Sequence, residues 1–322
     1  MRLRELGVTL LALALAVGFI QAVPERASEP VSIVSAVPRW AKGDRLALRE
    51  EHTSRRGTDG NKTKPSMKAS SVLDLEVLEA GPDGFVVRWT SGRPEIDTRG
   101  VAPQPLLEQL VKMTAGVGLE LVIDADGTPT GVRNAAEVRR KMKRIGAALR
   151  KELSEQDAPV ELIDGLLAQL ATTYETEEAI LEHVAKSASV YFLPLGWRFE
   201  PGVTIEYEAE IPSPAGTAPL PSQGTLALDS YDAGTGLARV TWTQRVDRER
   251  AGDAIRALVG SLLGGAEMPA DLSAAIDAVD IEDYAEYVID TRSGWVLDMT
   301  HERSVRMPGA ERIDRATIRR RS

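Results

Sequence analysis

The chain contains no cysteine. That absence excludes disulfide bonds, thiolate nucleophiles, cysteine-ligated metals and the cysteine that a lipoprotein needs after its cleavage site. Aromatic residues make up only 5% of the chain, which disfavours a sugar-binding surface built from stacked rings. The folded protein must therefore depend on its apolar core, and 322 residues are enough for one large domain or two smaller ones.

The sequence patterns of common active sites are also missing. No Gly-x-Ser-x-Gly elbow, phosphate-binding loop or dinucleotide-binding glycine pattern occurs. The three histidines, His52, His183 and His301, lack the spacing of a zinc site, and we expect His52 and His301 at solvent-facing strand positions. Adjacent acids such as Glu50 and Glu51 point to opposite faces of a strand. We therefore expect no catalytic residue, no cofactor and no metal ion.

Acidic residues outnumber basic ones, 48 to 39, and the formal net charge is −9. This balance disfavours nucleic-acid binding, which needs a basic surface. The spacing of Arg140, Lys143 and Arg144 nevertheless places three cations on one helix face. We favour a solvated helix face that is partly paired with Glu137 and Glu152. The alternative is a surface that contacts anionic lipid headgroups or an acidic partner. The whole basic segment comprises Arg133, Arg139, Arg140, Lys141, Lys143, Arg144, Arg150 and Lys151.

Long apolar runs are absent except at the N-terminus. Residues 7–20 are almost wholly apolar and follow Arg2 and Arg4, which is typical of a secretory signal peptide. We predict cleavage after Ala22. The alternative is an uncleaved anchor, but the run is short for a hydrocarbon core of ~30 Å. The mature chain is expected to be soluble, without a transmembrane segment, in the periplasm or else the extracellular medium.

Two stretches share the pattern Val-Ile-Asp followed by a turn, one in 118–132 and one in 284–297. Each predicts a β-hairpin, since turn residues separate two apolar-rich runs. Asp124-Ala-Asp126-Gly127 also invites a calcium interpretation. A calcium loop requires a glutamate at its twelfth position, which is occupied here by Ala135, so a hairpin turn is favoured.

The two hairpins belong to a longer repeated order of parts. A glycine-led strand (Gly43, Gly202) precedes a hairpin that ends near a tryptophan (Trp89, Trp242), and a helix and the Val-Ile-Asp hairpin follow. Equivalent residues are offset by 159, 153 and 166 positions, which puts the length differences in connecting segments. This order predicts an internal duplication in which Trp89 and Trp242 are equivalent and buried.

Residues 134–190 carry helical rather than strand patterns, with Asn134 as a predicted N-cap and Glu137 three residues later. Helices are also expected at 105–114, at 254–263 and at about 270–278, and a polar loop at 54–69. The predicted fold class is α+β: two similar antiparallel β units (strand, hairpin, helix, hairpin) forming one or two curved sheets, with a helical insert between them. The expected division is 1–22 signal peptide, 23–39 flexible leader, 40–133 first repeat, 134–190 helical insert and 191–322 second repeat.

Turn residues of this pattern carry a resemblance to exported bacterial proteins of an uncharacterised family. The matching pairs are Pro194 with Gly202, Asp124 with Gly127, and Asp290 with Gly294. More distantly, the layout is similar to half-barrel lipoprotein carriers of the bacterial envelope. That resemblance implies an acyl chain bound between a curved antiparallel sheet and helices.

Together these features favour an exported, non-catalytic binding or accessory protein of the cell envelope. Its expected partner is a lipid or another apolar ligand held between sheet and helices, or an envelope protein. The alternative is a structural or assembly protein with a filled core and a protein partner. A cavity of several hundred Å³ between sheet and helices would favour the ligand.

Overall fold

A computed structural model describes residues 33–57, 64–97, 115–155, 160–181, 186–211, 220–252, 279–308 and 310–321. The signal peptide and the helices expected at 105–114, 254–263 and about 270–278 lie outside these ranges. The described strands are β1 (Val34–Ser35), β2 (Arg45–Gly57), β3 (Lys64–Gly81), β4 (Gly84–Ser91), β5 (Glu95–Asp97), β6 (Gly118–Asp124), β7 (Pro129–Val132), β8 (Arg198–Phe199), β9 (Thr204–Ile211), β10 (Leu220–Asp232), β11 (Leu237–Val246), β12 (Asp280–Asp290), β13 (Trp295–Met307) and β14 (Ala310–Arg320). The described helices are α3 (Ala135–Glu155), α4 (Val160–Thr173), α5 (Glu177–Ala179) and α6 (Lys186–Phe192).

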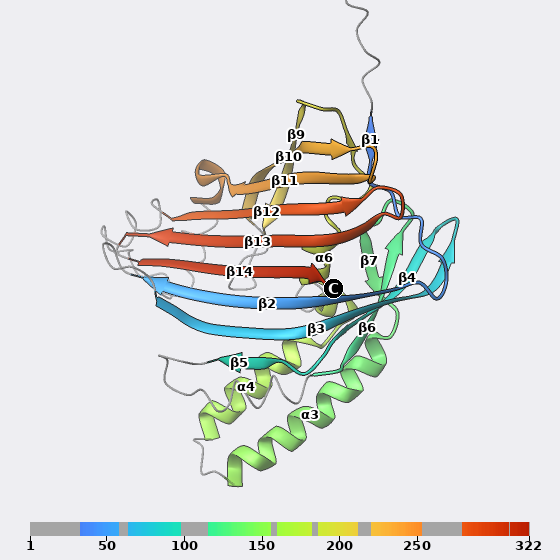
Figure 1. Cartoon of the computed structure of the whole chain (residues 1–322). Coiled ribbons are helices and arrows are strands. Elements are labelled where there is room, and N and C mark those ends of the chain that lie inside the picture. The colour runs from blue at the N-terminus through green and yellow to red at the C-terminus, as the bar shows by residue number, and fades with distance from the viewer. Residues whose placement is uncertain are drawn as a thin grey trace, which may run out of the picture. The chain divides into compact units, whose positions relative to one another are not determined.

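One antiparallel sheet contains both predicted repeats. Within the described ranges it has 12 strands in the order β7-β6-β4-β3-β2-β14-β13-β12-β11-β10-β9, and β5 pairs with β3 off this path. Figure 1 shows these strands side by side and curved. Strand β14 pairs with β2 and so joins the repeats. The α+β class is therefore confirmed, and the repeats form one sheet rather than two.

The strand registers of the two predicted repeats are alike. Strands β2-β3-β4-β6-β7 follow one another in the sheet as β9-β10-β11-β12-β13 do. Trp89 lies opposite Leu75 on one side and Leu119 on the other. Trp242 lies opposite Leu226 and Ala285 at the corresponding places. The exposed fractions of Trp89 and Trp242 are 6% and 2%, so both are buried as predicted.

Irregularities of the ladder recur as well. In the first repeat a β-bulge follows Val77, two residues beyond the partner of Trp89. In the second repeat a bulge follows Leu228, two residues beyond the partner of Trp242. A bulge locally increases strand twist. The same bend is thus built into both halves.

Regular structure is present within the segment 23–39, which was predicted to be a flexible leader. Strand β1 pairs with β8, and Val34 and Ala36 are buried. The Gly196 amide donates to the Ala36 carbonyl (2.9 Å), and the Arg39 amide donates to the Ser293 carbonyl (3.0 Å). Small and apolar residues allow this segment to pack, although it lacks the periodicity that signals a strand.

The loop predicted at 54–69 is partly wrong. Residues 54–57 continue β2, and 64–69 belong to β3, where Arg55 pairs with Pro65. Strand β14 is the reason, because Ile313 lies opposite Arg55 on the other side. Backbone hydrogen bonds from two neighbours stabilise a strand even where its side chains are polar.

The helical insert predicted at 134–190 is present, and its last helix is fixed firmly to the sheet. The Tyr191 hydroxyl of α6 donates to the Val296 carbonyl of β13, and the Tyr287 hydroxyl of β12 donates to the Val190 carbonyl of α6 (2.9 Å). Burial raises the pKa of both tyrosines well above the usual value, so both hydroxyls remain donors. Phe192 adds a tilted contact with Trp40, at 5.7 Å between ring centroids.

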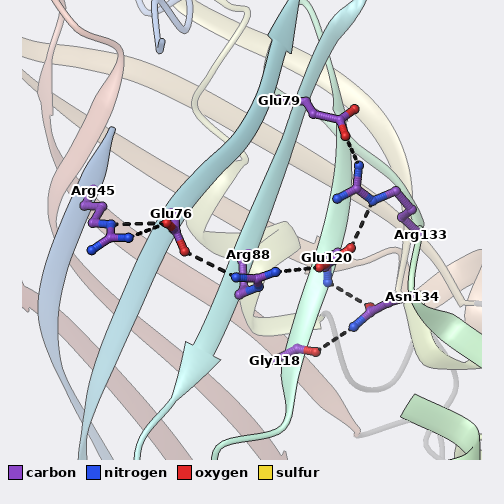
Figure 2. Close-up of polar contacts among 8 residues, drawn as sticks. All are labelled: Arg45, Glu76, Glu79, Arg88, Gly118, Glu120, Arg133 and Asn134. Carbon is purple, nitrogen blue, oxygen red and sulfur yellow. Dashed lines mark hydrogen bonds and ion pairs between the residues drawn. The ribbon is translucent and has the colours of Figure 1, made fainter. Parts of the chain in front are cut away.

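Asn134 has a different role from the one predicted. Its carbonyl accepts from the Val138 amide at the start of α3, but its side chain bonds to β6. The Glu120 amide donates to Asn134 Oδ1 (2.9 Å), and Asn134 Nδ2 donates to the Gly118 carbonyl (3.0 Å). Strand β7 ends at Val132, so the amide side chain pairs backbone groups of β6 beyond that end (Figure 2).

A ladder of alternating charges crosses the first repeat on the face opposite its core (Figure 2). Arg45 pairs with Glu76 (2.6 Å), and Glu76 pairs with Arg88 (3.4 Å). Glu120 then pairs with both Arg88 and Arg133, each at 2.9 Å. The hydrogen bond from Arg45 is the main cause that lowers the pKa of Glu76. The ladder links β2, β3, β4 and β6, so these charged residues have a structural role in the sheet.

Candidate ligand-binding groove

Two adjoining cavities lie between α6 and the sheet. One has a volume of about 390 Å³, and the other about 470 Å³. Lys186, Val190 and Arg303 line both cavities. We call the two together the α6 groove. Because Tyr191 and Tyr287 hold α6 in place by hydrogen bonds, the groove lies beside a fixed helix.

Part of the groove wall is apolar. Val190 faces both cavities, Met299 and Ile318 line the smaller one, and Leu193 and Trp242 line the larger. The Trp242 indole donates to the Tyr207 hydroxyl (2.7 Å), so its polar atom is satisfied within the protein. The wall offers apolar surface without an unpaired indole donor.

A carboxylate–histidine pair lines the smaller cavity. Glu50 Oε1 lies 2.7 Å from His52 Nε2, and the hydroxyls of Ser71 and Ser91 donate to Glu50 Oε2 at 3.3 and 3.4 Å. Burial disfavours both charges, but these contacts outweigh it: the pKa of Glu50 is lowered and that of His52 is raised. The pair is therefore held as an ion pair over a wider pH range than two free side chains would be.

A second pair, with an arginine beside it, lies on β12 and β13. His301 Nε2 is 2.8 Å from Asp283 Oδ1, and Arg303 Nε is 3.9 Å from Asp283 Oδ2. Only 7% of the Asp283 side chain is exposed. Next to it, Gln244 Nε2 donates to the buried Ser222 hydroxyl (2.7 Å). The buried carboxylate is thus compensated by cationic and hydrogen-bonding neighbours.

The two histidines lie on either side of Ala316. That residue is opposite His52 in β2 and opposite His301 in β13. Two strand spacings separate the histidine backbones, about 10 Å. Each Nε2 is paired with a carboxylate oxygen, that of His52 with Glu50 and that of His301 with Asp283. Within the ranges described, no group of three or more His, Asp or Glu side chains could hold a metal ion.

The expectation of a solvent-facing position is wrong for His301, whose side chain is 15% exposed, whereas the His52 side chain is 42% exposed. Both lie on the helix-facing side of the sheet, in line with the buried Leu48 and Met299. Sequence reasoning missed Glu50, Asp283 and Arg303 as well. A signal was present in β2: Leu46, Leu48, Glu50 and His52 alternate, so Glu50 and His52 continue the apolar face. The expectation that Glu50 and Glu51 point apart is correct, since Glu51 pairs with Lys68 (3.2 Å).

The structure places the predicted anionic-surface residues elsewhere. Arg140, Lys143 and Arg144 are exposed on α3, and none of them lines the α6 groove. Their role remains a prediction. The turn at Asp124 is confirmed, because Asp124 Oδ1 accepts from the amides of Asp126 (3.1 Å) and Thr128 (2.8 Å).

No family model and no curated protein sequence matches this chain. The chain is similar to a solved structure described as lipid–protein interactions in lipovitellin, with 7% identity and a TM-score of 0.45 over 88% of this chain and 25% of that one. The chain thus spans about a quarter of the lipovitellin chain.

Two further solved structures are similar at lower scores. DynF from the dynemicin biosynthesis pathway of Micromonospora chersina has 6% identity and a TM-score of 0.19, over 91% of this chain and 86% of that one. Ail, the attachment invasion locus protein of Yersinia pestis, has 6% identity and a TM-score of 0.17, over 86% of this chain and 97% of that one. All three TM-scores are below 0.5, so none carries an argument about fold or function.

Among the helices of the described ranges, none is both long enough and apolar enough to cross a membrane.

Proposed function

We propose that this protein is an exported, non-catalytic binding protein that holds an amphiphile in the α6 groove. The amphiphile is a molecule with one apolar chain and one polar end, such as a fatty acid or a lysolipid. The observation that carries the proposal is the pair of adjoining cavities between α6 and the sheet. Cavities of several hundred Å³ with a largely apolar wall and a few polar groups are typical of small-molecule sites.

The order of side chains along the strands supports an amphiphile over a uniformly apolar ligand. On the helix-facing side of β13, Met299 is followed by His301 and Arg303. On β2, the buried Leu48 is followed by Glu50 and His52. The same change from apolar to polar occurs on β2 and β13, which lie on either side of β14. An apolar chain would contact the first region, and a polar end would contact the second.

The alternative function, a structural protein with a filled core, is favoured by another part of the same interface. Tyr191 and Phe192 are fully buried beside Trp89, with Tyr191 and Trp89 ring centroids 5.5 Å apart. That region leaves no room for a ligand. The groove is formed by the preceding part of α6, at Lys186 and Val190, so a ligand and a filled core occupy different places.

Titration of delipidated protein with a dansyl-labelled fatty acid tests the proposal. Val190→Trp should fill the groove and weaken probe binding at least tenfold. Val203→Trp is the matched control, because Val203 is 47% exposed and lines neither cavity. Val190→Phe serves as a smaller filling variant if Val190→Trp does not fold. Equal binding by wild-type protein and a folded filling variant would favour the structural alternative.

Export is part of the proposal and has a separate test. N-terminal sequencing of the protein isolated from its host envelope should begin at Val23 or within a few residues of it. Membrane-bound material that retains Met1 would contradict cleavage.

A further inference from the structure

The basic segment of α3 divides into two sets of side chains. Most of its members are engaged: Arg133 pairs with Glu120 (2.9 Å), and Arg150 pairs with Asp164 (2.6 Å). Arg139 donates to the Glu175 carbonyl (2.8 Å). Lys151 lies 3.9 Å from Glu155, and Lys141 donates to the Gly116 carbonyl. These residues have local structural roles.

Arg140, Lys143 and Arg144 form the other set, which we call the α3 basic face. All three side chains are exposed, and none forms an ion pair within the described residues. The solvated-face interpretation pairs them with Glu137 and Glu152, but no such ion pair is present in the described part of the chain. Their positions i, i+3 and i+4 bring the three cations together within about one helical turn. An uncompensated positive face is unusual in a chain of net charge −9.

An apolar groove lies directly beside this face. A cavity of about 680 Å³ between α3 and α4 is lined by Met142, Gly146, Leu167, Leu170 and Tyr174. Lys143 of the basic face also lines it, as do Arg139 and Glu175. Gly146 forms part of the wall, where a Cβ would contact Leu167 Cδ2 at 3.4 Å and Leu170 Cδ2 at 3.5 Å.

We propose that the α3 basic face and the α3–α4 groove together dock this protein on a bilayer that contains anionic phospholipid. The cations meet the headgroups, and the groove accepts part of an acyl chain. Charge complementarity selects an anionic partner, and the adjoining apolar groove selects a lipid over an acidic protein or a free anion. Three such cations at a membrane surface are expected to strengthen binding about a hundredfold at low salt.

Flotation with vesicles tests this proposal. Wild-type protein should float with vesicles of phosphatidylcholine and phosphatidylglycerol at low salt, where screening is weakest, and not with phosphatidylcholine alone. The variant Arg140→Glu/Lys143→Glu/Arg144→Glu should lose at least tenfold in binding. The control Arg39→Glu/Lys42→Glu/Arg198→Glu changes net charge equally at exposed residues outside the face and should bind like wild type.

The groove has its own variant. Gly146→Ala narrows the space between α3 and α4 without a charge change, because its Cβ would contact Leu167 and Leu170, and it should weaken vesicle binding with an unchanged fold by circular dichroism. Undiminished binding by folded Gly146→Ala would overturn the acyl-chain contact. If both charge-reversal variants lost vesicle binding equally, the specific role of the α3 basic face would be overturned. If wild-type protein did not bind the anionic vesicles, the membrane would be overturned as the partner. Val190→Trp should bind vesicles normally. A negative result for membrane docking is therefore distinguishable from a negative result for ligand binding in the α6 groove.

Discussion

Gly127 and Gly294 lie 167 positions apart in the chain, at equivalent turns of the two repeats, and both pack against Pro38. Their φ angles are +100° and +76°. The Gly127 amide donates to the Asp124 carbonyl (3.1 Å), and the Gly294 amide donates to the Asp290 carbonyl (2.7 Å). The segment before β2 therefore contacts both halves of the duplication at the same structural point.

Gly294→Ala is predicted to destabilise the protein strongly. A Cβ at Gly294 would lie 2.5 Å from the Val37 carbonyl oxygen and 2.6 Å from Pro38 Cα, in addition to the cost of a positive φ. We expect a loss of about 3 kcal/mol or more in the free energy of unfolding. Gly43→Ala is the control, because Gly43 has φ +93° and open space around it, so a loss of about 1 kcal/mol is expected. Equal losses in urea unfolding would contradict the contact with Pro38.

Much of this duplication could be predicted from the sequence, because it depends on local patterns. Glycines that require positive φ, alternating strands and the two tryptophans recur in order, and a turn fixes the register of its hairpin. The pairing of β14 with β2 could not be predicted in this way. It joins residues such as Glu51 and Thr317, which are far apart in the chain, and nothing local specifies the register.

Asn134→Ser distinguishes the observed role of Asn134 from helix capping. Serine is as good an N-cap as asparagine, so it would preserve stability if capping were the role. Serine cannot pair both the Glu120 amide and the Gly118 carbonyl as the amide side chain does. We therefore expect Asn134→Ser and Asn134→Ala to lose similar stability, about 1–2 kcal/mol in denaturant unfolding. Wild-type stability in Asn134→Ser would show instead that Asn134 acts as a helix cap.

His52 should titrate above 6.5 in the folded protein. Burial lowers its pKa, but the hydrogen bond and charge of Glu50 raise it by more. Its contribution to stability is therefore fully present below pH 6.5 and is lost as the pH rises through the folded pKa. The pKa of Glu50 is lowered from 4.5, so its contribution is present above pH 4.5 and is lost as the pH falls through its folded pKa.

The pair should consequently stabilise the fold most between about pH 4.5 and 6.5. The melting-temperature difference between wild type and His52→Gln should be largest in that window and shrink at higher pH. An NMR titration, with the His52 resonance assigned by the same variant, measures the pKa directly. A value at or below 6.5 would mean that burial outweighs Glu50.

The candidate groove was less accessible to sequence reasoning than the repeats. Glu50 and His52 continue an apolar face in β2, which is a local signal. Asp283, His301 and Arg303 reach the same region only through the strand order, and α6 covers it only through contacts such as Tyr287 with Val190. Cavities arise where such long-range packing is incomplete, and no local pattern encodes that.

Native mass spectrometry of the protein isolated from its own cell envelope tests the central claim most directly. We predict a population of wild-type protein that carries one extra mass equal to a single-chain or lyso-type lipid, released by collisional activation. Val190→Trp should lack that mass, and Val203→Trp should retain it. Wild-type protein found only at the mass of its polypeptide, after gentle isolation without detergent, would contradict ligand binding in the α6 groove.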